Sequence, residues 1–249
     1  MITTSLLKTF TETRKRNNLT ENRLLAALSA KEFRKLAPDL EQVSLTLTQI
    51  LYESGDVIRH VYFPLDSLVS LLSEVDNRST LEVGIVGNEG MTGIGIFLGV
   101  KNSPFKAVVQ GAGTALRMKT SALRRHSEDN YRLKTLLQLY THALLTQVSQ
   151  SVACNRFHAV EARLARWLLG TRDRLAKDEF RLTQEFLSNM LGVRREIINK
   201  AAGTLSKRGL IIYMRGILTI LDDAGLAAAA CGCYAEIKAE YDNFLGLKS

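Results

Sequence analysis

The stretch RLTQEFLSNMLGVRREIINKAAGTLSKRGLI, residues 181–211, carries polar side chains at spacings that suit one exposed helix face. Four of them fall on one side of a helix near its beginning: Arg195, Glu196, Asn199 and Lys200. An Arg can donate twice to guanine O6 and N7, a Glu can accept from cytosine N4, and a Lys can donate to guanine or a phosphate. The chemistry that these residue types offer is therefore hydrogen bonding to base edges.

The spacing around Gly192 predicts two helices joined by a tight turn. Apolar residues occur on both sides of this glycine at Leu187, Leu191, Val193, Ile198 and Ala201, and the small Ser188 lies four positions before it. Helices that cross steeply need a turn glycine, a small side chain at the contact and apolar residues inside the angle. Thr183 is a suitable N-cap and Gly209 a suitable stop. The alternative is a packed helix pair that binds no ligand.

Several flanking groups could contact a nucleic-acid backbone. Thr183 and Gln184 lie at a predicted helix N-terminus, where backbone N–H groups can accept a phosphate. After Gly209, LIIYMRGILTILD predicts two short strands around Arg215, a wing whose arginine could contact the backbone or the minor groove. Arg194 is expected to support the same contacts.

The positive charge is concentrated on this part of the chain. The formal net charge is +8, and residues 156–215 hold thirteen Lys and Arg against six acidic residues, which gives +7. Residues 216–249 hold two Lys and five acidic residues, which gives −3. This distribution favours a polyanionic partner such as double-stranded DNA, although a solvated basic face is the alternative.

Composition excludes several other classes of protein. The 249 residues are 46% apolar and 23% charged, as in soluble globular proteins, and the longest apolar runs fall short of the ~20 residues that a membrane span needs. We expect a cytoplasmic protein that contacts no membrane. The absence of a nucleophile elbow, phosphate loop or paired carboxylates predicts that the chain is not an enzyme.

The cysteines suggest free thiols. Cys154 and His158 are spaced i, i+4 and give half a metal site, and Cys231 and Cys233 have no further ligand close in sequence. Three cysteines are too few for a secreted disulfide framework. The sequence therefore predicts no metal and no cofactor.

The chain divides into four predicted segments, and the fold class is α+β. Residues 1–20 form a tail and 21–125 a sensor domain, in which a short helical entry precedes many short strands, typical of an antiparallel β-roll of jelly-roll type. Residues 126–156 hold one long helix, and 157–249 form a winged helix-turn-helix.

The long helix carries an apolar seam with steps of three and four residues: Leu133, Leu137, Tyr140, Leu144 and Val148. A connecting helix has no evident core of its own, so pairing with a second copy is the simplest way to bury this seam. We therefore predict a dimerisation helix. The alternative is that the seam lies against the chain's own β-domain.

The sequence resembles the Crp/Fnr family of transcriptional regulators over roughly residues 20–225. The recognition helix of that family carries an R-E-x-x-x-R/K element, matched here by Arg195, Glu196 and Lys200, and YESGDVIRHVYFPLDSLVSLL resembles its early β-roll strands. The resemblance implies a cyclic-nucleotide-binding-like β-roll, a dimerisation helix and a winged helix-turn-helix. It also implies a homodimer that reads an inverted repeat, with RNA polymerase as a partner if it activates.

The sequence departs from the family pattern at the residues that would bind an effector. Family members that bind cyclic nucleotides hold the phosphate with a Gly-Glu-Leu turn and a following Arg, whereas no Arg occurs here between Arg78 and Arg117. Glu89, Lys101 and Lys106 remain as candidates for an effector pocket, and cyclic AMP is not expected as the effector. No N-terminal cysteine cluster is present to hold an iron-sulfur centre.

Two other functions remain open. One is a β-roll ligand-binding module that acts through protein partners, with the C-terminal helices used for contact. The other is a switch based on the thiols or a metal at Cys154, Cys231 and Cys233.

Overall fold

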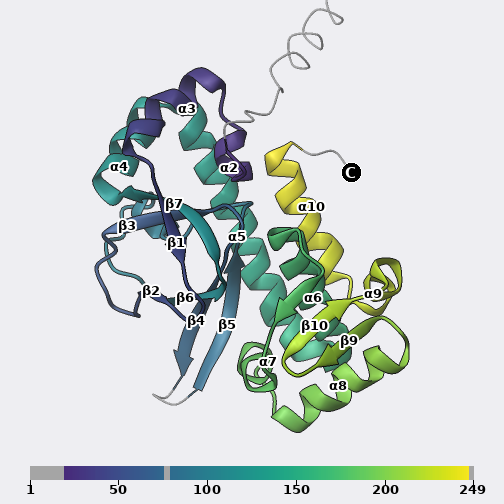
Figure 1. Ribbon diagram of the computed structural model, residues 1–249. Helices are drawn as coiled ribbons and strands as arrows, with labels where there is room; N and C mark the ends of the chain where they lie inside the picture. The colour runs from purple at the N-terminus through teal and green to yellow at the C-terminus, as the bar shows by residue number, and fades with distance from the viewer. Residues whose placement is uncertain (1–19, 76–78, 247–249) are drawn as a thin grey trace, which may run out of the picture.

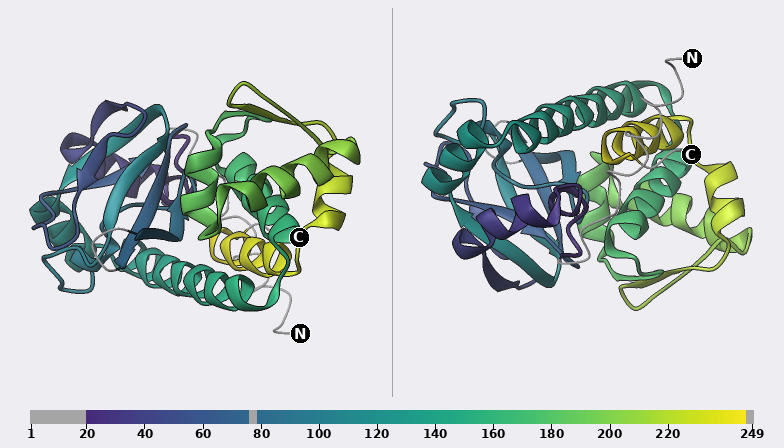
Figure 2. Two further views of the ribbon diagram at one scale, coloured as in Figure 1. Left: turned by 90° about the horizontal axis from the view of Figure 1, so that it is seen from below. Right: turned by 90° about the horizontal axis from the view of Figure 1, so that it is seen from above.

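The computed structural model describes residues 20–75 and 79–246, so the predicted N-terminal tail lies outside the described residues except for Thr20. A β-roll lies on one side, a long helix runs along it, and a smaller helical domain with a three-stranded sheet lies on the other side (Figures 1 and 2). This arrangement confirms the predicted α+β fold class.

The N-terminal helices cover one end of the roll. They are α2 (Arg23–Ala26), α3 (Ala30–Leu36) and the 3-10 turn η1 (Ala37–Asp39). Asn22 caps α2 by accepting from the Leu25 amide, and Ser29 and Glu32 form a capping box at the start of α3. The entry predicted over 21–37 is thus two short helices.

Two antiparallel sheets make up the roll. The strands are β1 (Glu41–Leu45), β2 (Ile50–Tyr52), β3 (His60–Pro64), β4 (Leu68–Val75), β5 (Ser79–Val86), β6 (Lys106–Gly111) and β7 (Gly113–Lys119), with the 3-10 turn η2 (Ile94–Ile96) between β5 and β6. The strand orders are β1-β7-β3 and β2-β6-β4-β5. Their inward apolar side chains, including Val61, Phe63, Val69 and Met118, form the main core.

The long helix α5 (Tyr131–Phe157) follows α4 (Thr120–Asp129), and the Asn130 side chain caps its first turn by accepting from the Leu133 amide. The apolar seam that we predicted as a dimer interface lies in the core of its own chain. Leu133, Leu137 and Tyr140 are fully buried there. Leu144 is buried in the same core, and Val148 is half-buried.

The prediction that Leu133, Leu137, Tyr140 and Leu144 form a dimer interface is therefore wrong, while that for the half-buried Val148 stays a prediction. Periodicity identifies which side of a helix is apolar, but it does not identify what covers that side. Here the cover is the roll together with the C-terminal helix, whose Tyr241 and Phe244 rings lie 6.4 and 6.1 Å from the Tyr140 ring.

The C-terminal part contains a winged helix-turn-helix. Its elements are α6 (Val160–Leu175), β8 (Glu179–Arg181), α7 (Gln184–Leu191), α8 (Arg195–Lys207), β9 (Ile211–Met214), β10 (Ile217–Ile220), α9 (Asp223–Ala229) and α10 (Cys233–Leu245). The two wing strands around Arg215 confirm the prediction. Strand β8 was not predicted, because the sequence showed no sign of a strand before Leu210; it pairs with β10.

Helix α10 lies along α5 rather than within the winged domain (Figure 2). The predicted domain of residues 157–249 includes this helix, whereas Ile237 and Tyr241 of α10 belong to the core around α5 and the roll. Trp167, Leu187, Ile198 and Leu218 form the separate core of the winged domain. The last helix therefore connects the two parts.

Substitution of Gly192 tests whether the turn between α7 and α8 needs a glycine. Its φ of +62° lies in the left-handed region, and a Cβ added there would lie 2.9 Å from Leu81 Cδ1. We expect Gly192→Ala to lower the free energy of unfolding by about 1–2 kcal/mol, from backbone strain alone. Equilibrium unfolding in urea measures the change.

Gly203 provides the matched control. It lies inside α8, and a Cβ added there has no neighbouring atom within 4 Å. Gly203→Ala should stabilise the protein by about 0.5–1 kcal/mol through helix propensity. A Gly192→Ala protein as stable as the wild type would show that the turn does not need this glycine.

Candidate nucleic-acid interface

The turn between α7 and α8 is built as its sequence predicted. The Thr183 hydroxyl accepts from the Phe186 amide at 3.0 Å and so caps α7. Gly192 ends α7 in the left-handed conformation, and the Val193 amide donates to the Ser188 carbonyl at 3.1 Å. Gly209 follows α8 with a φ of +72°. These local signals fix the direction in which α8 leaves the turn.

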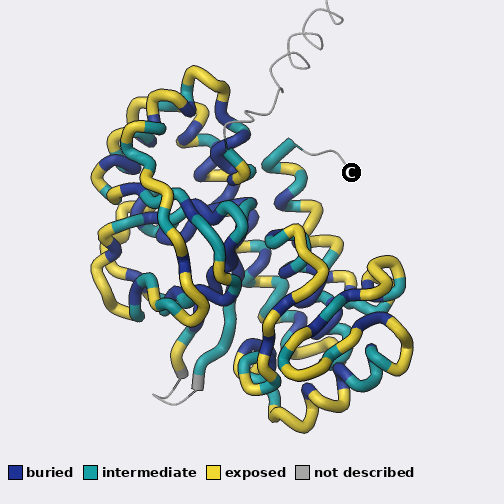
Figure 3. Tube along the Cα trace, viewed as in Figure 1, coloured by how far each residue is buried: buried dark blue, intermediate teal, exposed yellow. Residues whose placement is uncertain are grey.

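Helix α8 has one buried and one exposed face. Ile198 and Leu205 are fully buried and Ala201 nearly so, against α6 and the wing. The four predicted base-reading residues are all exposed on the other face: Arg195, Glu196, Asn199 and Lys200. Arg194, the N-cap of α8, is exposed beside them. Figure 3 shows this exposed side of α8 at the outer edge of the molecule.

The predicted backbone contacts converge on the same place. Thr183, Gln184, Arg195 and Arg215 line one surface hollow between α7, α8 and the wing. Arg195 Nε donates to Gln184 Oε1 at 3.2 Å, which holds the guanidinium over the beginning of α7. Residues that the sequence places up to 32 positions apart are thus neighbours in the structure.

Tyr213 also lines this hollow, and sequence reasoning missed it. Its hydroxyl donates to the Leu182 carbonyl at 2.9 Å, which ties strand β9 to the start of α7. Beyond it, Arg215 and Gly216 have φ values of +52° and +77°, as in the tight turns that match strand twist. The alternation of apolar residues in β9 gave no sign that this tyrosine faces the site.

The cations of this surface are not paired with acidic groups. Among the described residues, no carboxylate lies within 4.0 Å of the side-chain nitrogens of Arg194, Arg195, Lys200 or Arg215. Their charge is therefore available to an anionic ligand, and a phosphate backbone is the ligand that such a spread of cations suits.

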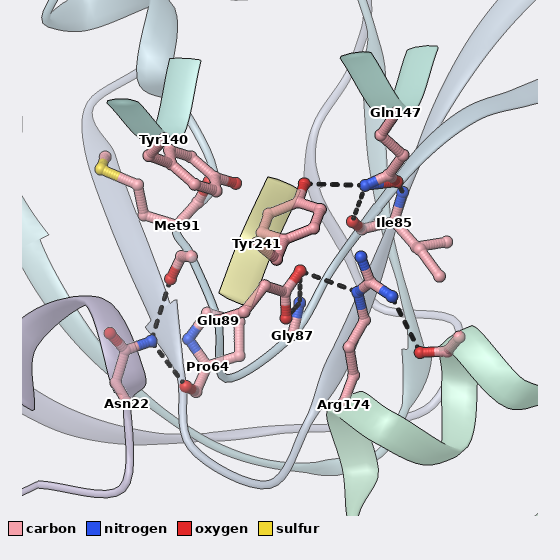
Figure 4. A network of polar contacts seen from close by, with 12 residues as sticks. Asn22, Pro64, Ile85, Gly87, Glu89, Met91, Tyr140, Gln147, Arg174 and Tyr241 are labelled. Atoms are coloured by element: carbon pink, nitrogen blue, oxygen red, sulfur yellow. Dashed lines mark hydrogen bonds and ion pairs between the residues drawn. The ribbon is translucent and has the colours of Figure 1, made fainter. Parts of the chain in front are cut away.

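Glu89, the candidate effector residue, is buried in an ion pair with the winged domain (Figure 4). Arg174 Nε of α6 donates to Glu89 Oε1 at 2.7 Å, and the Gly87 amide donates to Glu89 Oε2 at 3.1 Å. The guanidinium also donates to the Gly170 carbonyl and lies 5.2 Å from the centre of the Tyr241 ring. Both charges are thus enclosed by hydrogen bonds and an aromatic face.

The turn that carries Glu89 is held from several sides. The side-chain amide of Asn22 donates to the Gly90 carbonyl at 2.9 Å, and the Tyr140 hydroxyl donates to the Met91 carbonyl at 2.8 Å. A Cβ on Gly90 would lie 2.1 Å from the Tyr140 ring, so only glycine permits this approach. The turn is therefore fixed by α2, α5 and α6 together.

A cavity of about 60 Å³ lies beside the Glu89–Arg174 pair. Its wall includes Glu82, whose carboxylate accepts from Trp167 Nε1 at 2.8 Å and from the Ser70 hydroxyl at 2.6 Å. Burial raises the pKa of Glu82 to about 7, against the opposing effect of these two hydrogen bonds. Since Trp167 belongs to α6, this is a second polar contact between the roll and the winged domain.

The other two candidate effector residues lie elsewhere. Lys101 is exposed, and Lys106 forms an ion pair with Glu53 at 3.1 Å. Neither lines the cavity beside Glu89. The structure therefore does not bring Glu89, Lys101 and Lys106 together into one pocket.

The structure brings together two pairs of candidate ligands that lie far apart in the sequence. Cys154 and His158 at the end of α5 lie next to Cys231 and Cys233 at the start of α10. Only the i, i+4 spacing and the Cys-Gly-Cys spacing were visible in the sequence. Their proximity depends on how α10 packs on α5.

Comparisons with known proteins show which domain and which solved structures this chain resembles. Residues 162–229 match the Crp-like helix-turn-helix domain. FixK2 from Bradyrhizobium japonicum has a similar structure, with a TM-score of 0.64 at 13% identity over 78% of this chain and 98% of that chain. No curated protein sequence matches the chain.

Two further solved structures are similar. The c-di-GMP responsive global regulator CLP from Xanthomonas campestris gives a TM-score of 0.64 at 16% identity, over 78% of this chain and 100% of that one. A transcriptional regulator assigned to the Crp/Fnr family from Eubacterium rectale gives 0.62 at 15% identity, over 83% and 96%.

Residues 162–229 therefore match a Crp-like helix-turn-helix domain, and the chain shares its fold with solved structures of Crp/Fnr-type regulators. No helix in the described residues combines the length and the apolar character that crossing a lipid bilayer requires.

The buried ion pair generates a stability prediction. Arg174→Met leaves the Glu89 carboxylate buried without its partner, which should cost about 3–5 kcal/mol of unfolding free energy. Adding Glu89→Gln should restore part of this loss, because the double variant buries no unpaired charge. Urea unfolding of the two single variants and the double variant measures the coupling.

Lys238→Met is the matched control, since it breaks an exposed ion pair with Asp242 on α10. Its cost should stay below about 1 kcal/mol. If Arg174→Met is as mild as this control, the pair does not hold the winged domain against the roll.

Proposed function

We propose that this chain is a homodimeric, sequence-specific DNA-binding transcriptional regulator of the Crp/Fnr type. The observation that carries the proposal is the convergence of Arg195, Gln184, Thr183 and Arg215 on one exposed hollow beside the N-terminal end of α8. An exposed helix N-terminus with unpaired cations and a flanking wing suits the major groove and the phosphates beside it.

Within this surface, residue chemistry assigns two kinds of contact. Arg195 and Lys200 can donate to guanine, Glu196 can accept from cytosine N4, and Asn199 can pair with adenine N6 and N7. Phosphate contacts would come from the remaining four predicted residues: Thr183, Gln184, Arg194 and Arg215. The first group would set the sequence preference, and the second would set position and overall affinity.

A dimer along α5 would have to use the face opposite the buried seam. On that face exposed side chains recur at steps of three and four residues: Gln138, His142, Leu145, Ser149, Val152 and Arg156. Leu145 and Val152 are 63% and 66% exposed, so this face offers apolar surface to a partner. The 3.5-residue repeat is the spacing of a two-stranded coiled coil.

The buried ion pair between Glu89 and Arg174 restricts which effectors could bind at this turn. Glu89 is paired with Arg174 of the same chain, so this guanidinium is not free to bind a cyclic nucleotide phosphate. We therefore do not expect cyclic AMP in the family's usual mode. RNA polymerase would be a partner if the protein activates transcription.

Selection of bound duplexes from a random DNA library, at two salt concentrations, tests the function. We expect enrichment of an inverted repeat with half-sites about one helical turn apart. No enrichment above nonspecific binding at either salt concentration would contradict the proposal and favour a module that acts through protein partners.

Arg195→Ala should then weaken binding to the selected duplex by about 1–3 kcal/mol and relax the preference at one base pair in each half-site. Arg194→Ala should weaken binding to all duplexes alike and reduce the salt slope by about one. Fluorescence anisotropy on selected and random duplexes distinguishes these two results.

Arg34→Ala is the charge-matched control, because Arg34 is exposed on α3, far from α8. It should change neither affinity nor preference. An equal loss on selected and random DNA for Arg195→Ala would refute its assignment as a base reader.

The exposed face of α5 gives a separate prediction. Leu145→Glu with Val152→Glu should convert the protein from dimer to monomer in sedimentation equilibrium, because four charges would meet across a symmetric seam. Leu98→Glu, at a 56% exposed leucine in the roll, should leave the dimer intact. A doubly substituted protein that remains dimeric would place the interface elsewhere.

A further inference from the structure

Four potential metal ligands meet at the junction of α5 and α10. Cys154 lies in the last turn of α5 and His158 is its C-cap, while Cys231 precedes α10 and Cys233 is its first residue. The three Sγ atoms and an imidazole nitrogen all lie within 4.8 Å of one another. Cysteines and a histidine in this number are the ligands of a structural zinc site.

Two of the distances between ligand atoms lie close to those of tetrahedral coordination, within a set that spans up to 4.8 Å. The Sγ atoms of Cys154 and Cys231 lie 3.4 Å apart, and Cys233 Sγ lies 3.5 Å from His158 Nδ1. With Zn–S near 2.3 Å and Zn–N near 2.1 Å, a tetrahedron requires about 3.8 Å between sulfurs and about 3.6 Å between sulfur and nitrogen. Shifts of a few tenths of an ångström at these two contacts would reach that geometry.

Backbone hydrogen bonds position both pairs of ligands. The His158 amide donates to the Cys154 carbonyl at 3.1 Å, so the end of α5 presents the two side chains on one side. The Tyr234 amide donates to the Cys231 carbonyl at 3.0 Å, which folds Cys231 and Cys233 into one turn. Because each pair is set by its own local structure, the site needs only the packing of α10 on α5 to assemble.

The surroundings suit an anionic centre. All three cysteines are buried, and the positive charge of Arg166 faces each of the thiols. Arg166 Nε is buried and has no hydrogen-bond partner among the described residues. Three thiolates, one neutral imidazole and Zn²⁺ carry a net charge of −1, which this guanidinium would compensate.

We propose that Cys154, His158, Cys231 and Cys233 bind one zinc ion as a structural Cys3His site. The protein supplies all four ligands, so no coordination position stays open for catalysis. Thiolate ligands favour zinc over magnesium or calcium. His158 is exposed, which leaves one side of the site open for the metal to enter.

The site would join segments that are far apart in the chain. It would tie the end of α5, just before the winged domain begins, to the helix that follows the wing. If the proposed function holds, bound zinc also fixes the angle at which α8 is presented to DNA, a consequence that rests on that function. The metal site itself does not depend on it.

Metal content of the full chain, purified under reducing and anaerobic conditions, tests the proposal. Elemental analysis should give about one zinc per chain, and cobalt substitution should give thiolate-to-metal charge-transfer bands with the strong visible bands of a tetrahedral site. All three thiols should be protected from a thiol reagent until a chelator removes the metal.

Substitution of the proposed zinc ligands provides a second test. Cys154→Ser and Cys233→Ser should each lose stoichiometric zinc, and His158→Asn should bind it at least tenfold more weakly. His60→Asn is the matched control, because His60 lies on β3 of the roll and not on α5 or α10. If the cysteine variants do not fold, thiol protection and chelator competition on the wild-type chain still decide the question.

Two results would overturn the proposal. One is a reduced wild-type chain that stays metal-free in added zinc with all three thiols reactive. The other is a Cys154–Cys231 disulfide in the isolated protein whose reduced form binds no zinc, which would indicate a thiol switch instead. A chain that binds zinc but selects no DNA sequence would contradict only the proposed function.

Discussion

The ion pair between Glu89 and Arg174 determines how the two halves of this chain fit together. Two buried charges require good geometry and further hydrogen bonds, since desolvation costs several kcal/mol per ion. Here Gly87, Gly170 and the Tyr241 ring complete the surroundings of the pair. Each of these groups comes from a different element, so a small displacement of the roll, α6 or α10 would leave a charge incompletely satisfied.

The pair also connects the candidate sensing turn with the candidate DNA surface. Arg174 and Trp167 lie on α6, and both contact carboxylates of the roll, Glu89 and Glu82. Helix α6 also packs on α8, and Trp167 belongs to their shared core. A ligand that displaced Arg174 from Glu89 would therefore loosen the helix on which α8 rests. Such a ligand would have to replace a guanidinium beside a cavity that is lined mainly by polar and charged side chains.

Local signals in the sequence predicted the helix-turn-helix well, because its geometry depends on nearby residues. Thr183, Gly192 and Gly209 have the roles that their types and spacing indicate. Contacts between distant segments could not be predicted in this way. Glu89 and Arg174 are 85 positions apart, and Cys154 and Cys231 are 77 apart. Nothing in a periodic pattern relates such residues, since the first pair forms where α6 packs on the roll and the second where α10 packs on α5.

The burial of the apolar seam of α5 limits what kind of dimer could form along this helix. Its most apolar face is already buried in its own chain, so the remaining face mixes Leu145 and Val152 with His142, Ser149 and Arg156. Polar residues in a coiled-coil seam specify register and partner at a cost in stability. His142 also lies 3.5 Å from Glu240 of α10, and this contact would compete with any contact across the seam. Such a dimer would be weaker than one built on the buried seam. A palindromic DNA site, which binds both copies at once, would then stabilise its assembly through mass action.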